Sequence, residues 1–110
     1  MTLPLYQLKA EFFKTLGHPA RIRILELLSQ REHSVAELLS EVGLEPAHMS
    51  QQLAVLRRAN LVTSHKAGAT VTYAITSPQI VDLLAVARSI LTGVLTEQAE
   101  LLQDLRASAP

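Results

Sequence analysis

One continuous stretch, residues 34–76, limits the fold of this 110-residue chain more than any other. Ser34 and Glu37 have the spacing of a capping box, in which each side chain bonds the backbone N–H of the other residue and so starts a helix. Gly43 supplies the turn that ends this helix, and Pro46 suits the first position of another, where a missing N–H costs nothing. The first half of the stretch is therefore expected to be a helix, a turn and a second helix.

The second half of the stretch has the pattern of two strands. Val71, Tyr73 and Ile75 alternate with polar or small residues, and Gly68 lies where a hairpin tip requires unusual backbone dihedrals. Helix, turn, helix and hairpin in this order define a winged helix-turn-helix, whose second helix can enter the major groove of DNA. The expected segments are a helix-turn-helix at residues 34–59 and a wing hairpin at residues 61–76.

Helices on both sides complete a single expected domain of residues 1–110, mainly α with a small β-hairpin, in the order α-α-α-α-β-β-α. The last helix, residues 78–106, is apolar on two faces and cannot satisfy both against one small domain. We expect one face to pack on its own core and the other on a second copy, with the first helix, residues 1–16, joining it in a homodimer. The alternative is a long core helix in a monomer. The residues expected at the dimer interface are Leu5, Leu8, Phe12, Leu84, Ala87, Leu91, Val94 and Leu101.

The charge of the chain is zero overall but is unevenly distributed. Residues 46–76 carry Arg57, Arg58 and Lys66 and no acid, whereas the other parts of the chain compensate with Asp and Glu. A basic segment of this kind is typical of a surface that meets nucleic acid, even in a protein without net charge.

The chain contains no cysteine, which excludes disulfides, thiolate metal ligands and thiol redox switching. No apolar run approaches the roughly 20 residues of a membrane span, and the N-terminus lacks the layout of a signal peptide. We therefore expect a cytoplasmic protein without a membrane partner.

The second helix of the stretch is the expected DNA-reading element. Met49, Leu53 and Leu56 recur at i, i+4 and i+7 and bury one face, which leaves the polar side chains toward solvent or a partner. Amides can pair with adenine edges, a hydroxyl can reach a base or a phosphate, and the late arginines suit phosphate contacts or salt bridges. The residues expected to contact DNA are His48, Ser50, Gln51, Gln52, Arg57, His65 and Lys66.

The runs GHPARIRILELL, SVAELLSEVGL and HMSQQLAVLRRANLV, with the hairpin that ends in TYAIT, resemble the ArsR/SmtB family of bacterial winged-helix repressors. The resemblance covers nearly the whole chain. It implies a homodimer, formed through the first and last helices, that represses transcription at a pseudo-palindromic operator on double-stranded DNA and leaves when a signal arrives. It also implies that His48, Ser50, Gln51 and Gln52 occupy the recognition-helix positions.

This chain departs from that family at the metal sites and near the DNA. Ser34 and Ala36 stand where the family's thiolate site needs cysteines, and only Asp82 fills one of the four ligand slots of the last-helix zinc site. Glu45 takes a helix N-cap slot where Ser or Thr is common, and the wing is poor in arginine. We expect no metal site, no cofactor and no catalytic residue, so the protein is not expected to be an enzyme. The four histidines are expected as a helix N-cap (His18), a loop residue (His33), a DNA-facing residue (His48) and a wing residue (His65).

Two alternatives stay open at this point. One is a winged-helix interaction module that has lost DNA binding, which the neutral charge and the weak wing favour. The other is a sensor with a metal or ligand site outside the family's known positions. The signal itself is not identified by any motif.

Overall fold

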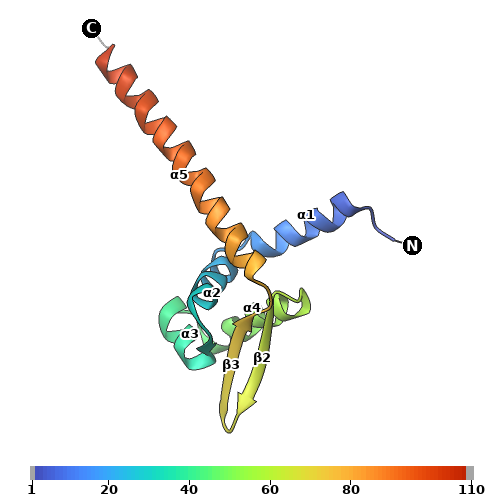
Figure 1. The fold of residues 1–110 in the computed structure, drawn as a ribbon. Helices are drawn as coiled ribbons and strands as arrows, with labels where there is room; N and C mark the ends of the chain where they lie inside the picture. The colour runs from blue at the N-terminus through green and yellow to red at the C-terminus, as the bar shows by residue number, and fades with distance from the viewer. Residues whose placement is uncertain (1, 109–110) are drawn as a thin grey trace.

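The computed structural model describes residues 2–108, so Met1, Ala109 and Pro110 of the expected domain lie outside the described residues. Five helices and three short strands follow one another, and the antiparallel sheet has the strand order β1-β3-β2 (Figure 1). The fold class expected from the sequence is confirmed, with one strand added. The elements are α1 (Leu5–Leu16), α2 (Pro19–Gln30), β1 (His33–Ser34), α3 (Val35–Val42), α4 (Pro46–Arg58), β2 (Val62–Ala67), β3 (Thr70–Ile75) and α5 (Pro78–Ala107).

The added strand β1 changes the place of His33. His33 pairs with Tyr73 of β3, its side chain is only 3% exposed, and its Nδ1 lies 2.9 Å from the carbonyl oxygen of Arg31. The expectation that His33 is a loop residue is therefore wrong. Through this pairing the sheet is joined to the start of α3.

The core lies where α2, α3, α4 and the sheet meet. Ile24, Leu25, Leu38, Met49 and Leu56 are completely buried there. Met49 and Leu56 belong to the apolar stripe that the sequence predicts for α4, and Leu53 completes it at 2% exposure. The recognition-helix candidate is thus anchored along one whole side.

Local signals in the sequence set the helix ends. The Ser34 hydroxyl accepts the Glu37 N–H at 3.1 Å and the Glu37 carboxylate accepts the Ser34 N–H at 3.0 Å, so the capping box is confirmed. His18 caps α2, since its Nδ1 accepts the N–H of Ala20. Gly43 has a φ of 76° after α3, the left-handed region that glycine adopts without a Cβ penalty.

The end of α4 is fixed by a motif that the sequence analysis missed. Asn60 has a φ of 60°, its N–H donates to the carbonyl of Arg57, and the N–H of Leu61 donates to the carbonyl of Leu56, both at 3.0 Å. This pair of bonds is a Schellman motif, accompanied here by the buried side chains of Leu56 and Leu61. It fixes the angle at which the chain leaves α4 for the wing.

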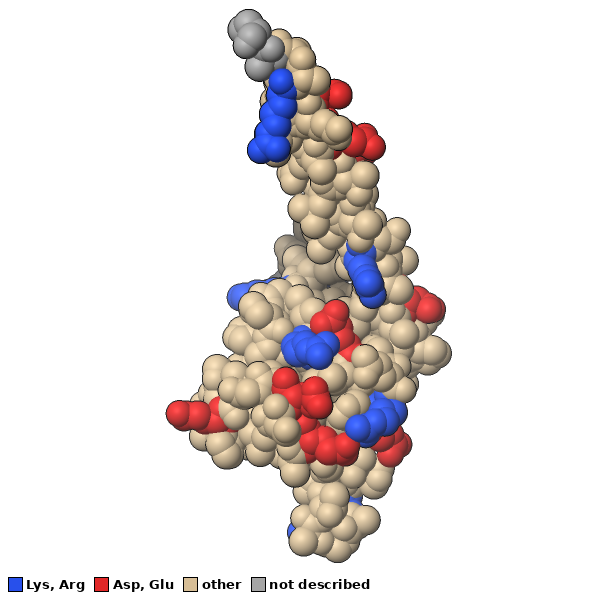
Figure 2. Space-filling model, turned by 90° about the vertical axis from the view of Figure 1, so that its left-hand side faces the viewer, with Lys and Arg blue, Asp and Glu red and all other residues tan. Residues whose placement is uncertain are grey.

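Helix α5 leaves the body of the protein and projects alone, at the end opposite the β2–β3 hairpin (Figure 1). All of its residues from 85 to 107 are exposed, and the radius of gyration is 18.3 Å where about 13 Å is usual for this length. In the space-filling view the projection is mostly uncharged (Figure 2). The expectation that one face of α5 packs along its own core holds only for its start and is wrong for the rest.

Candidate nucleic-acid interface

The free face of α4 lies opposite its buried stripe. Successive residues turn about 100° around a helix, so Ala47, Gln51, Ala54 and Arg58 form a line along the middle of the face that the core leaves free. Gln51 and Arg58 are exposed, and within residues 2–108 the Gln51 side chain makes no hydrogen bond. These two side chains are the polar groups on the axis of this face, and Arg58 is one of the two late arginines that the sequence suggests for phosphate contacts or salt bridges.

The expectation that Gln52 faces solvent is wrong. Gln52 is only 7% exposed, and its Oε1 accepts a hydrogen bond of 2.9 Å from Nη1 of Arg21. The same guanidinium donates through Nε to the carbonyl of Thr15, at 2.6 Å. One arginine of α2 therefore ties the last turn of α1 to the inner side of α4.

His48 is exposed, as expected, but it lies on the flank of α4 that faces α2. Its ring meets the ring of His18 edge to face, with the ring centroids 6.4 Å apart. Val42 and Leu44 line the same shallow depression. His48 is therefore separated from Ser50, which lies on the other flank.

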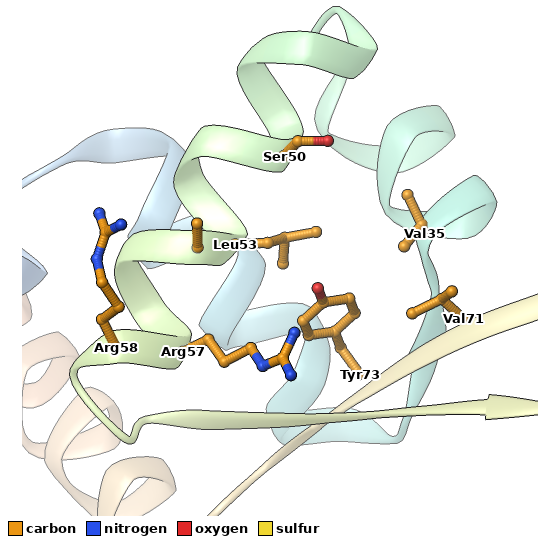
Figure 3. Close-up of a pocket in the computed structure, with 8 residues that line it drawn as sticks. Val35, Ser50, Leu53, Arg57, Arg58, Val71 and Tyr73 are labelled. Atoms are coloured by element: carbon orange, nitrogen blue, oxygen red, sulfur yellow. The ribbon is translucent and has the colours of Figure 1, made fainter.

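That other flank borders a hollow of about 660 Å³ between α4, the start of α3 and strand β3 (Figure 3). Ser50 and Arg57 line it from α4, and Tyr73 lines it from β3. Figure 3 shows Arg57 directed toward Tyr73, whereas Arg58 extends on the opposite side of α4. The two arginines thus serve different parts of the surface.

The wing places His65 and Lys66 side by side on β2, opposite Thr72 and Val71 of β3, and both are exposed. The hairpin turns at Gly68, whose φ is 62°, so the glycine expected at the tip is confirmed. The two side chains point to opposite faces of the ribbon because successive strand residues alternate. The two side chains therefore approach a partner from different sides of the wing.

The positive charges of this surface have no acidic partners in the part of the chain that the structure describes. The ion pairs there join Arg23 to Glu26 at 3.7 Å and Arg31 to Glu37 at 2.7 Å, both outside residues 46–76. The hydrogen bond from Arg31, together with that from the Ser34 N–H, holds the pKa of Glu37 at about 2. Glu37, at the start of α3, is thus engaged locally, and the charges of α4 and the wing stay available.

The expected dimer residues divide into two groups. Phe12 and Leu84 are half-buried against their own core. The others are exposed, and the exposed fractions of the leucines and of Val94 among them run from 43% for Val94 to 65% for Leu5. The exposed members are Leu5, Leu8, Ala87, Leu91, Val94 and Leu101.

Helix α5 is also long and apolar enough to cross a membrane, the one such helix in residues 2–108, with an 18-residue window of mean hydropathy 1.5. The expectation that no apolar run approaches this length is therefore wrong. This observation uses only the length and the composition of the helix. A helix that packs on another protein can have the same length and composition.

The histidines and acids do not gather into a metal centre within the described residues, where no group of three or more potential ligands occurs. His18 and His48 are the one pair of histidines whose rings meet there. His33 is buried in the sheet, and His65 lies on the wing.

The fold and this surface define a winged helix-turn-helix protein. A family model described as bacterial regulatory protein, arsR family, matches residues 18–64. The HTH-type transcriptional regulator Rv0081 of Mycobacterium tuberculosis, named as uncharacterized, is 60% identical over 94% of this chain and 92% of its own length. The chain belongs to the ArsR family of bacterial transcriptional regulators.

Solved structures agree with this assignment. The crystal structure of Rv0081 superimposes with a TM-score of 0.83 at 58% identity, over 89% of this chain and 99% of that one. The transcriptional repressor BigR of Xylella fastidiosa gives 0.73 at 30% identity, over 77% and 87% of the two chains. The homodimeric winged helix-turn-helix DNA-binding domain Mb0332 of Mycobacterium bovis gives 0.76 at 26% identity, over 84% and 86%.

Proposed function

We propose that the protein is a homodimeric repressor of transcription that binds a pseudo-palindromic DNA operator through α4. The observation that carries the proposal is the division of the molecule into two ends. One end presents the unpaired polar face of α4 beside the wing, and the other presents an apolar α5 with nothing packed on it within residues 2–108. The similarity to a DNA-binding homodimer from M. bovis and to a repressor from X. fastidiosa supports the same division of roles.

At the DNA end, Gln51 is proposed to read a base edge, because an amide can pair bidentately with adenine. Arg57 and Arg58 are proposed to meet phosphates on the two sides of α4, and Ser50 to reach a base or a phosphate. His65 and Lys66 on the wing are proposed to touch the backbone. Gln52 takes no direct part, since its side chain is bonded to Arg21 inside the protein. His48 is proposed to approach a phosphate from the α2 side.

At the other end, a second copy is the occupant that best fits α5. Asp82, Arg88 and Glu97 interrupt its apolar surface, and charges at these intervals are costly inside a lipid bilayer. A two-fold pair of α5 helices, flanked by the α1 helices, buries the apolar side chains and leaves such charges at the rim. In this arrangement the two α4 helices can enter successive major grooves of DNA, which lie about 34–36 Å apart.

The protein is further proposed to act in the cytoplasm, where the DNA is, and to have no catalytic activity. The residues proposed for the DNA end bind DNA and orient the protein on it. Among the hydrogen bonds of residues 2–108, none pairs a nucleophile with a base.

Fluorescence anisotropy with labelled duplexes from the promoter regions around the gene tests the proposal. Several phosphate contacts predict an affinity that falls by about 10³-fold or more between 50 and 200 mM salt. Gln51→Ala is expected to relax the preference at one base position, and Lys66→Ala to weaken all sequences about equally. Gln30→Ala, an exposed amide on α2, is the matched control and is expected to change neither.

Two results would contradict the proposal: a monomer at micromolar concentration, or an affinity that hardly depends on salt. A stable dimer without any DNA binding would favour the interaction module instead. If Gln51→Ala and Lys66→Ala changed specificity in the same way, the division into base and phosphate contacts would be wrong.

A further inference from the structure

The hollow beside α4 combines apolar walls with a few polar groups that converge. Val35 of α3, Leu53 of α4 and Val71 of β3 form the walls, while Arg57 and Tyr73 supply the polar atoms at the base (Figure 3). Its volume of about 660 Å³ lies within the range of small-molecule sites, roughly 300–1,000 Å³. The guanidinium of Arg57 is directed into this space and the lining contains no carboxylate, so the hollow favours an anion.

Tyr73 is the residue that most favours a bound ligand in this hollow. The residue is 8% exposed, and its hydroxyl makes no hydrogen bond within residues 2–108. No buried side-chain oxygen or nitrogen in that part of the chain lacks a partner, which means that the hydroxyl is not sealed in the core but opens into the hollow. A tyrosine this deeply buried normally finds a partner for its hydroxyl. Here the hydroxyl is left free to bond a polar group that enters the hollow.

Arg57 lines the base of the same hollow from α4, across from Tyr73 of β3. Its guanidinium makes no ion pair within the described residues, and Figure 3 shows it directed toward Tyr73. A guanidinium and a phenol hydroxyl on facing walls can both donate to one carboxylate, and charge-assisted bonds of this kind are the strong ones. The apolar walls require that the rest of the ligand be apolar.

We propose that the hollow binds a small organic acid, with its carboxylate between Arg57 and Tyr73 and an aromatic or branched aliphatic body against Val35, Leu53 and Val71. The effect of this acid on DNA binding rests on the proposed function, because Arg57 and Ser50 belong both to the hollow and to the flank of α4 that is proposed to face DNA. An occupied hollow therefore competes with DNA, and by linkage DNA weakens the acid to the same degree. This supplies a signal to a chain that has no cysteine.

The test titrates the protein without DNA. Benzoate and isovalerate are the probes, benzyl alcohol supplies a ring without charge, and inorganic phosphate supplies charge without an apolar body. Binding is followed by the shifts of backbone amide signals in two-dimensional NMR. At least one acid is expected to bind at 10 mM or below, at least 10-fold more tightly than either comparison compound, and to shift the amides of Val35, Val71 and Tyr73.

Five variants locate the site. Tyr73→Phe keeps the ring and is expected to weaken the acid about 3- to 10-fold, and Arg57→Gln by more than 10-fold. Tyr6→Phe and Arg88→Gln change the same residue types outside the hollow and are expected to bind as the unmodified protein does. Val71→Phe, which fills the hollow without removing a polar group, is expected to abolish binding and keeps the test valid if Tyr73→Phe folds poorly.

Several outcomes overturn the inference. These are no binding of either acid at 10 mM, unchanged binding in Tyr73→Phe and Arg57→Gln, or phosphate binding as tightly as benzoate. Phosphate binding as tight as that of benzoate would indicate that the hollow is a binding site for a DNA phosphate. Unchanged DNA affinity in the presence of saturating acid would refute the competition. Because acid binding is measured without DNA, its failure leaves the proposed repressor function standing, and a failure to bind DNA leaves the acid titration interpretable.

Discussion

Replacing Gln52 by leucine tests the tie between α1, α2 and α4. The substitution keeps the volume and the burial of the side chain but removes the oxygen that accepts the 2.9 Å hydrogen bond from Arg21. A hydrogen bond to a charged group contributes about 1.5–3 kcal/mol, and the added apolar burial offsets part of this loss. We expect the free energy of unfolding to fall by about 1–2 kcal/mol, which corresponds to roughly 4–15 °C in the melting temperature.

Urea unfolding at one fixed protomer concentration is the assay, because the stability of a dimer depends on concentration. Gln51→Leu, the exposed neighbour on the same helix, is the matched control and is expected to change stability by less than about 0.5 kcal/mol. A double-mutant cycle with Arg21→Met is expected to give a coupling of about 1–2 kcal/mol. Equal stability of Gln52→Leu and the unmodified protein, or simple additivity in the cycle, would refute the reasoning.

Substitutions at three further positions, with Ser89→Asp as a control, probe the caps and the proposed dimer. Asn60 has a positive φ, so Asn60→Gly is expected to keep the stability in urea while Asn60→Val loses about 1–2 kcal/mol; equal losses would argue against the Schellman motif. Arg31 lowers the pKa of Glu37 from 4.5 to about 2. The ionised Glu37 carboxylate therefore contributes to the stability of the fold above pH 4.5, and this contribution is lost as the pH falls toward 2. Thermal unfolding of Glu37→Gln should therefore depend less on pH in that window, and an identical pH dependence would exclude the ion pair as its cause. Leu91→Asp is expected to give monomers at micromolar concentration in sedimentation, whereas Ser89→Asp, on the opposite side of α5, is expected to leave dimers; a dimeric Leu91→Asp would place the interface elsewhere.

The sequence predicts most of the fold because its signals are local. The capping box at Ser34, the turn at Gly43 and the hairpin glycine at Gly68 each act over a few residues, and the structure has each of them. Strand β1 escaped prediction because two residues carry no alternation to detect. Its partner, Tyr73, is 40 positions away from His33.

The candidate site was less accessible to sequence reasoning, for two physical reasons. Gln52 lies about 40° around α4 from Leu56, at the edge of the apolar stripe, so the helical period alone does not decide its burial. Its partner Arg21 lies 31 positions away in the sequence. The hollow is lined by side chains from α3, α4 and β3 together, so no residue spacing within a single helix or strand predicts it. Function class follows from ordered local motifs, whereas the polar contacts of the site depend on tertiary packing.

Selection of duplexes from a random pool by the purified protein tests most directly whether the free face of α4 reads DNA as a two-fold pair. The expected result is an inverted repeat whose half-site centres are separated by about one helical turn, 10–10.5 base pairs, or a multiple of it. Selection with Gln51→Ala is expected to lose the preference at one position in each half-site and to keep the spacing. Enrichment of no sequence, or of a sequence without two-fold symmetry, would contradict a dimer that reads DNA through α4.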